Sequence, residues 1–107
     1  MRCETHIIDI DGCIFEKIHK TASDQWVATP PVVEGFIEWL DAREKEGACI
    51  ILMTARRESC RPELESMLAA AGVYYDELIM GITNGARIIH NDGPCWADKR
   101  EVNQCWV

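Results

Sequence analysis

Two aspartates, Asp9 and Asp11, stand two residues apart at the end of a short apolar run and are followed by Gly12. Alternate residues of a strand project from the same face, so a strand that continues through Asp11 would place both carboxylates side by side. Such carboxylates repel each other unless a proton or a cation lies between them. Mg²⁺ fits this need, because it is commonly held by one or two carboxylates together with a substrate phosphate. The pair therefore predicts phosphoryl chemistry, in which one carboxylate attacks phosphorus and the other moves a proton.

Further polar residues follow apolar runs later in the chain. Thr54 comes directly after a nearly continuous apolar run, and Asn91 and Asp92 follow a shorter one. Ligands bind beyond the carboxyl ends of the strands in open parallel sheets, so such a sheet would gather these groups beside the aspartate pair. We expect the hydroxyl of Thr54 to bind phosphate oxygens and Asn91 and Asp92 to supply oxygen ligands to the metal.

The segments that must position these residues alternate between strand-like and helix-like patterns. Short runs of β-branched and apolar residues predict strands, and apolar residues at i, i+3, i+4 and i+7 after Pro30 and Pro31 predict a helix. Such alternation is typical of an α/β fold with a parallel sheet. We expect strands at 6–10, 48–53, 77–80 and 87–90, helices at 32–46 and 60–71, and a short edge strand at 102–107.

Length and composition limit the classes of protein that fit. The 107 residues suffice for a single domain over 1–107, and a hydrophobic fraction of 48% is that of a globular protein. The net charge of −7 would repel a polyphosphate backbone, which argues against a nucleic-acid partner. No apolar stretch approaches the roughly 18 residues that a membrane span needs. The six cysteines show no CxxC spacing, so we expect free thiols in a reducing cytoplasm, with a disulfide between Cys95 and Cys105 as the alternative.

The sequence resembles one enzyme superfamily over residues 5–92. HIIDIDGCIF resembles the first motif of haloacid dehalogenase (HAD) proteins, ILMTARRE is similar to their second motif, and YYDELIMG with ARIIHND resembles the close of their small bacterial phosphatases. The resemblance implies a three-layer, Rossmann-like fold with a central, mostly parallel sheet. It implies a magnesium-dependent phosphatase with Asp9 as nucleophile and Asp11 as general acid/base, acting on a sugar phosphate or similar small phosphorylated metabolite. The Asp11 backbone carbonyl and a carboxylate of the last motif would also bind Mg²⁺.

The chain departs from the HAD pattern in its third and fourth motifs. Ile82 stands where many small members carry a Lys that neutralises the phosphate. Arg87 is our preferred substitute for this Lys, with Arg56 and Lys99 as alternatives. In the fourth motif an amide replaces the first of two usual carboxylates, which leaves Asp92 as the charged ligand.

Too few residues separate the motifs for a cap domain. The interval between Gly12 and Pro31 has room for a flap, and between Thr54 and the next expected strand only one helix fits. We therefore expect an open site, unless a second copy of the chain covers it. The expected site comprises Asp9, Asp11, Thr54 and Arg87 for catalysis, Gly12, Ala55 and Arg56 for substrate binding, and Asp9, Asp11, Asn91 and Asp92 for the metal.

Two other functions fit parts of this pattern. A phospho-accepting signalling domain also gathers Asp and Thr at strand ends, but it usually carries its acceptor Asp after a later strand, where this chain has Thr54. A catalytically weak binding or regulatory domain fits the missing Lys. Release of phosphate from a generic aryl phosphate, with and without Mg²⁺, distinguishes the hydrolase from the weak binding domain.

Overall fold

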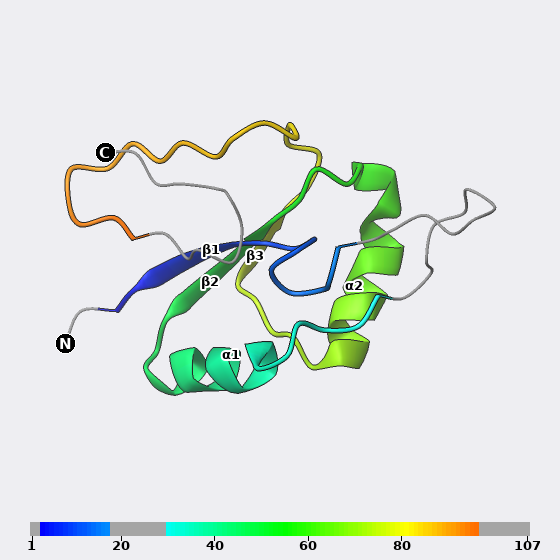
Figure 1. Ribbon diagram of the computed structural model, residues 1–107, viewed down its shortest axis with the longest axis horizontal. Helices are drawn as coiled ribbons and strands as arrows, with labels where there is room; N and C mark the ends of the chain where they lie inside the picture. The colour runs from blue at the N-terminus through cyan, green and yellow to red at the C-terminus, as the bar shows by residue number, and fades with distance from the viewer. Residues whose placement is uncertain (1–2, 18–29, 97–107) are drawn as a thin grey trace.

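The computed structural model of the chain describes residues 3–17 and 30–96 (Figure 1). Its described strands form one parallel sheet in the order β1-β2-β3, with β2 in the centre. In the described part of each connection between neighbouring strands lies one α-helix, so the expected α/β class with a parallel sheet is confirmed. The elements are β1 (Thr5–Asp9), α1 (Phe36–Lys45), β2 (Cys49–Met53), the 3-10 turn η1 (Glu58–Cys60), α2 (Arg61–Ala71) and β3 (Glu77–Ile79).

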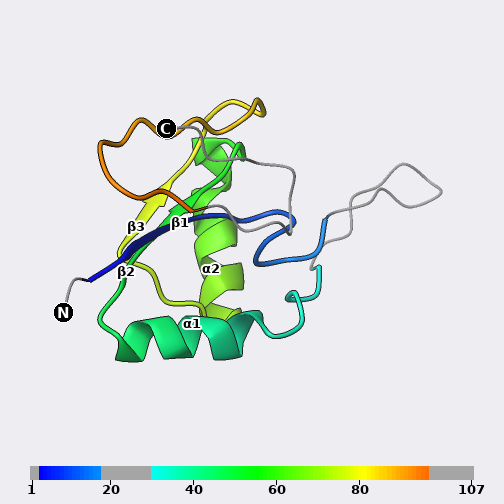
Figure 2. The same ribbon diagram turned by 60° about the vertical axis from the view of Figure 1, so that its left-hand side comes forward.

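One face of the sheet is buried under the two helices (Figure 2). Successive strand residues point to opposite faces, and the even-numbered residues of the strands form the buried one. Ile8 is 9% exposed, Ile50 and Leu52 are 0% exposed, and Leu78 is 6% exposed. The helices contribute Phe36 and Leu40 from α1 and Leu64 and Leu68 from α2 to the same core.

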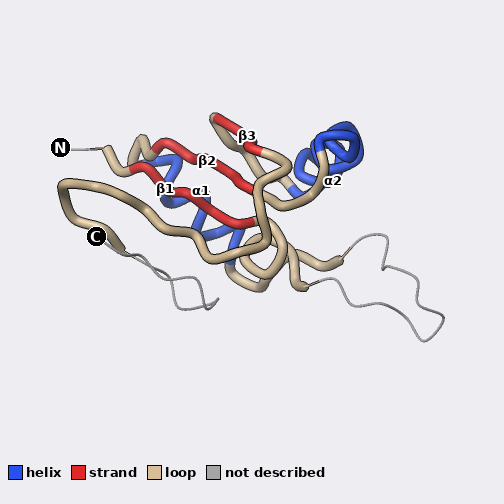
Figure 3. The backbone as a smooth tube through the Cα atoms, turned by 90° about the horizontal axis from the view of Figure 1, so that it is seen from above, coloured by secondary structure: helices blue, strands red, loops and turns tan. Residues whose placement is uncertain are grey.

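The opposite face is only partly covered by the residues that the structure describes. Ile7 and Ile79 point to this face and are 45% and 44% exposed. Residues 82–89, which follow β3, form no helix (Figure 3). A pocket of about 310 Å³ is lined by Ile7, Met53, Ile82, Thr83, Ala86, Arg87, Ile88 and Ile89. The apolar run of β2 is typical of a strand buried on both faces, yet Met53 is only half-buried, because an irregular segment covers it in place of a helix.

α1 begins at Phe36, four residues later than the helix expected over 32–46. Val32 forms an antiparallel bridge with Phe15, which holds this part of the chain extended before the helix can start. Gly35 then turns the chain into the helix with a φ of 83°, a conformation that glycine adopts readily. The periodicity therefore predicted the buried face of the helix correctly but placed its start too early.

The fourth strand expected at 87–90 was wrong, because these residues form no strand. Ile88 is 58% exposed. Arg87 donates hydrogen bonds from Nη1 to the carbonyl oxygens of Thr83 and Gly85. These contacts tie Arg87 to the turn that precedes it. The edge strand expected at 102–107 lies outside the described residues.

Two expectations concern the cysteines and the membrane. Cys3, Cys49 and Cys60 are free thiols, whereas Cys95 is disulfide-bonded, which corrects the expectation of free thiols at that position. Cys105, its partner in the alternative given above, lies outside the described residues. Within 3–17 and 30–96 the structure contains no helix with the length and apolar character needed to cross a bilayer.

Gly72 ends α2 in the left-handed conformation, with a φ of 78°. A Cβ there would meet no atom within 4 Å, so a side chain would cost backbone strain alone. We expect Gly72→Ala to lower the free energy of unfolding by about 1 kcal/mol. Gly85 is the matched control, because its φ is not positive and a Cβ would make an ordinary contact with Thr83, 3.8 Å away. Gly85→Ala should leave stability unchanged or raise it slightly. Urea unfolding followed by circular dichroism measures both, and equal losses would contradict the expectation.

Candidate active site

The chain turns tightly after β1 ends at Asp9. The carbonyl oxygen of Ile10 accepts hydrogen bonds from the backbone N–H groups of Ile14, at 3.0 Å, and Phe15, at 3.2 Å. Gly12 has a φ of 96° and donates its N–H to the carbonyl oxygen of Phe15 at 2.7 Å. Ile10 and Ile14 are 0% exposed and Phe15 is 2% exposed, so the turn is anchored in the core. This anchoring fixes Asp11 just beyond the end of the strand.

A short antiparallel pair, which we call the neck, leaves this turn. It consists of residues 14–16 and 31–33, joined by the bridge between Phe15 and Val32 and by hydrogen bonds of 2.8 and 2.9 Å. The segment for which a flap was expected therefore starts and ends beside the candidate site. Its residues 18–29 lie outside the described part of the chain.

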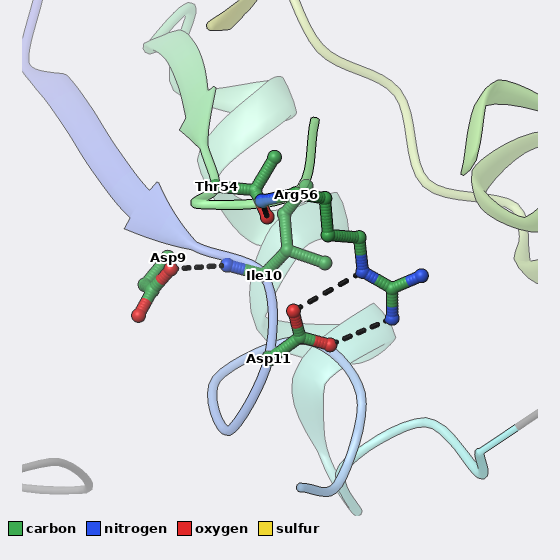
Figure 4. Close-up of polar contacts among 5 residues, drawn as sticks. All are labelled: Asp9, Ile10, Asp11, Thr54 and Arg56. Atoms are coloured by element: carbon green, nitrogen blue, oxygen red, sulfur yellow. Dashed lines mark hydrogen bonds and ion pairs between the residues drawn. The ribbon is translucent and has the colours of Figure 1, made fainter. Parts of the chain in front are cut away.

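Arg56 holds the carboxylate of Asp11 in a two-pronged ion pair (Figure 4). Nη2 donates to Oδ1 at 2.8 Å and Nε donates to Oδ2 at 3.2 Å. The Arg56 side chain is 22% exposed and that of Asp11 is 34% exposed, so water reaches both without surrounding them. The hydrogen bonds that Arg56 donates to Asp11 and the negative charge of Asp11 raise the pKa of Arg56 above its ordinary value, although burial opposes this. Arg56 therefore stays charged.

Asp9 is oriented differently from Asp11. Its Oδ1 accepts a hydrogen bond from the backbone N–H of Ile10 at 3.0 Å, and the residue is half-buried. Figure 4 shows the carboxylate of Asp11 turned toward Arg56 rather than toward Asp9. The side-by-side arrangement expected for the two aspartates required a strand that continues through Asp11. β1 ends at Asp9, so the strand alternation does not extend to Asp11.

Thr54 connects the ends of β2 and β3. Its backbone N–H donates to the carbonyl oxygen of Ile79 at 3.0 Å, and its carbonyl oxygen accepts from the N–H of Ile82 at 3.2 Å. The Oγ1 of Thr54 accepts the backbone N–H of Arg56 at 3.1 Å, across a half-buried Ala55. Thr54 is 1% exposed. In the structure its buried hydroxyl orients the main chain of Arg56. Binding of phosphate by this hydroxyl stays a prediction.

The other expected site residues lie on the segment that follows β3. Arg87 lines the pocket on the open face of the sheet, and its Nε is buried without a hydrogen-bond partner. Asn91 and Asp92 are exposed, and Asn91 donates to the carbonyl oxygen of Pro94 at 3.2 Å. In Figures 1 and 3 residues 90–96 lie toward the end of the sheet where β1 begins. Lys99 lies outside the described residues.

Sequence reasoning missed two contacts of Arg56. Its pairing with Asp11 joins residues 45 positions apart, and no pattern in the sequence signals it. The second contact is the backbone N–H of Gly81, which donates to the carbonyl oxygen of Arg56 at 2.8 Å. Gly81 directly follows an expected strand and has a φ of 75°, a conformation that glycine adopts readily. A glycine at the end of a strand was thus the available sequence signal for the turn that makes this contact.

Comparisons of the chain with protein-family models, with curated proteins and with solved structures find no match. What the site can do therefore follows from its own residues. Around the carboxyl ends of the three strands the structure places Asp9 and Asp11 after β1, Thr54 and Arg56 after β2, and Gly81 after β3.

Proposed function

We propose that the chain is a magnesium-dependent phosphomonoester hydrolase with a HAD-type, three-layer, Rossmann-like fold and no cap domain, acting on a sugar phosphate or a similar small metabolite. One observation carries the proposal: the half-buried Asp9 ends β1, and the ion pair of Asp11 with Arg56 follows directly beside it. A carboxylate nucleophile, a second carboxylate and a fixed cation are the groups that phosphoryl transfer to an aspartate uses.

In this reaction Asp9 attacks phosphorus. The N–H of Ile10 holds its Oδ1 at 3.0 Å, which orients the carboxylate on the rigid end of β1. The attack forms an aspartyl-phosphate and breaks the ester bond. The leaving oxygen takes a proton from Asp11, whose carboxylate has first left Arg56 and taken up a proton from the solvent. The Asp11 carboxylate then accepts a proton from the water that attacks the aspartyl-phosphate, which releases phosphate and restores Asp9.

The residues at this edge fit a Mg²⁺ ion that binds together with the substrate. Asp9 supplies a carboxylate and Asp11 supplies its backbone carbonyl oxygen. The bridge between Asp11 and Phe15 is made by hydrogen bonds of Ile10 and Gly12, so it does not use the Asp11 carbonyl oxygen. Within 3–17 and 30–96 no group of three or more His, Cys, Asp or Glu is placed to hold a metal. Mg²⁺ does not require one, since it keeps several waters and binds one or two carboxylates plus substrate phosphate. The bound ion would offset the charge of the transferring phosphate. Residues 90–96 lie toward the opposite end of the sheet (Figure 1), so the structure does not bring the predicted ligands Asn91 and Asp92 to this edge.

Release of phosphate from an aryl phosphate tests the proposed activity. We expect turnover with Mg²⁺, a loss of at least about a hundredfold on chelation with EDTA, and recovery when Mg²⁺ is restored in excess. The physical reason is that a phosphate dianion approaching two aspartates is repelled unless a divalent cation offsets the charge. Turnover that is indifferent to EDTA would contradict the proposal.

A catalytically weak binding domain is the second candidate function. The observation that favours it is the engagement of both Asp11 carboxylate oxygens by Arg56, which leaves the acid/base turned away from Asp9. Binding of phosphomonoesters without turnover across a broad panel, with Mg²⁺ present, would favour this candidate over the hydrolase.

A further inference from the structure

Arg56 is anchored at the carboxyl ends of all three strands. Its N–H is bound by Thr54 after β2 at 3.1 Å, and its carbonyl oxygen by the N–H of Gly81 after β3 at 2.8 Å. Its guanidinium reaches Asp11 after β1, at the end of a side chain that is 22% exposed. The main chain of Arg56 is thus fixed, while its side chain is partly exposed to solvent. The guanidinium can exchange one partner for another without a change in the backbone.

The ion pair uses the part of the guanidinium that also recognises phosphate. Nε and Nη2 form the planar fork that matches two oxygens of a carboxylate or of a phosphate. Figure 4 shows the third nitrogen of Arg56 pointing away from Asp11. A phosphate dianion presents the same pair of oxygens as Asp11 with a larger charge. Phosphate therefore competes with Asp11 for this fork.

The negative charges at this edge of the sheet would repel a phosphate, so a cationic side chain is needed to bind it. Asp9 and Asp11 repel an incoming phosphate, and the chain as a whole has a net charge of −7. Arg87 is the other expected cation in the described part of the chain, but its Nη1 donates to two carbonyl oxygens of its own turn. Binding phosphate through that nitrogen would break these bonds, whereas Arg56 exchanges one anion for another.

We propose that Arg56 is the phosphate-binding cation of the site and that Asp11 holds it until a phosphate arrives. The phosphate takes over the Nε–Nη2 fork, and the carboxylate of Asp11 is released from it. In the ion pair both Asp11 oxygens face Arg56 and not Asp9, so this release frees Asp11 to turn toward the reacting group. The role of the released Asp11 rests on the proposed hydrolase, while the exchange itself is a binding event that is measured without turnover.

Titration calorimetry with inorganic phosphate, in a constant excess of Mg²⁺, tests the exchange. Arg56→Gln should weaken phosphate binding by about tenfold or more, because two charge-assisted hydrogen bonds are lost. Arg56→Lys should fall between Arg56→Gln and the parent, since it keeps the charge without the fork. Arg57→Gln is the matched control, because it removes the same charge from the exposed neighbouring residue and should change binding by less than about twofold.

A double-variant cycle separates the exchange from general electrostatics. Asp11→Asn should tighten phosphate binding by about threefold or more when Arg56 is present, because the competing carboxylate is gone, and this gain should vanish in the Arg56→Gln background. An equal gain in both backgrounds would overturn the inference. So would phosphate binding that depends on Arg87 and not on Arg56, or a parent protein that binds no phosphate.

Two measurements keep the result independent of folding and of catalysis. The ¹⁵Nε resonance of Arg56 in the parent protein should shift on addition of phosphate, and an unmoved resonance at saturating phosphate would refute the exchange even if the Arg56 variants do not fold. Magnesium-dependent turnover of the parent is assayed separately. Turnover without Arg56-dependent phosphate binding refutes only the exchange, and the full binding pattern without turnover refutes only the proposed hydrolysis.

Discussion

Asp9→Asn should lower magnesium-dependent phosphate release by about a thousandfold or more, because an amide does not form an aspartyl-phosphate. The substitution preserves the shape of the side chain. Its amide oxygen can still accept the Ile10 N–H, which Oδ1 of Asp9 binds at 3.0 Å, so the turn after β1 should be retained. The loss should appear in kcat, since the group that is removed acts in the chemical step. Steady-state kinetics on an aryl phosphate measure it, with circular dichroism as the check on folding.

The matched control for this experiment is Asp41→Asn. Asp41 is exposed on α1, away from the carboxyl ends of the strands, and the substitution makes the same chemical change with the same loss of charge. Turnover of this variant should equal that of the parent. A folded Asp9→Asn protein that keeps full magnesium-dependent turnover would show that Asp9 is not the nucleophile.

Leu68→Ala should lower the free energy of unfolding by about 2–5 kcal/mol. Leu68 is 0% exposed and belongs to the core between α2 and the buried face of the sheet. Truncation removes its contacts there and leaves a cavity that the neighbouring side chains fill only in part. Since small domains are stable by only about 5–15 kcal/mol, the loss is a large share of the total. Urea unfolding should show a lower midpoint with an unchanged m-value.

Ile79→Ala on the other face of the sheet is the control for this core prediction. Ile79 is 44% exposed, so its truncation removes less packed surface and should cost about 1 kcal/mol or less. If Ile79→Ala proved as costly as Leu68→Ala, the open face of the sheet would be covered in solution, contrary to its exposure here.

Local sequence signals predicted the central elements well. β2 and α2 begin within one residue of the expected positions and end at them. An uninterrupted apolar run marks β2, and Pro62 in the first turn and Gly72 at the C-cap mark the two ends of α2. The start of α1 failed because Val32 pairs with Phe15, a contact between distant residues that competes with the local helix signal. The strand expected at 87–90 failed because an apolar run signals a strand but not the neighbour it needs, and these residues form no ladder with the described strands.

The candidate site was predictable only up to the ends of the strands. Apolar runs placed Asp9 and Thr54 at the carboxyl edge, since a strand ends where its apolar run ends. Gly12 signals a turn after β1, but the direction of the Asp11 side chain depends on the hydrogen bonds of that turn with Ile14 and Phe15, which the sequence does not give. The sequence left Arg87, Arg56 and Lys99 as rival cations, and only the folded chain shows Arg56 paired with Asp11.

The neck isolates the candidate site from changes in the stretch of chain that it closes. Backbone hydrogen bonds join residues 14–16 to residues 31–33. The length and composition of the stretch between them can therefore change without moving Asp9 or Arg56. Lengthening a loop that is closed at its base costs little, since the closure entropy grows only with the logarithm of its length. Insertions or deletions between the two strands of the neck should therefore leave the ion pair of Asp11 with Arg56 and the stability of the fold nearly unchanged.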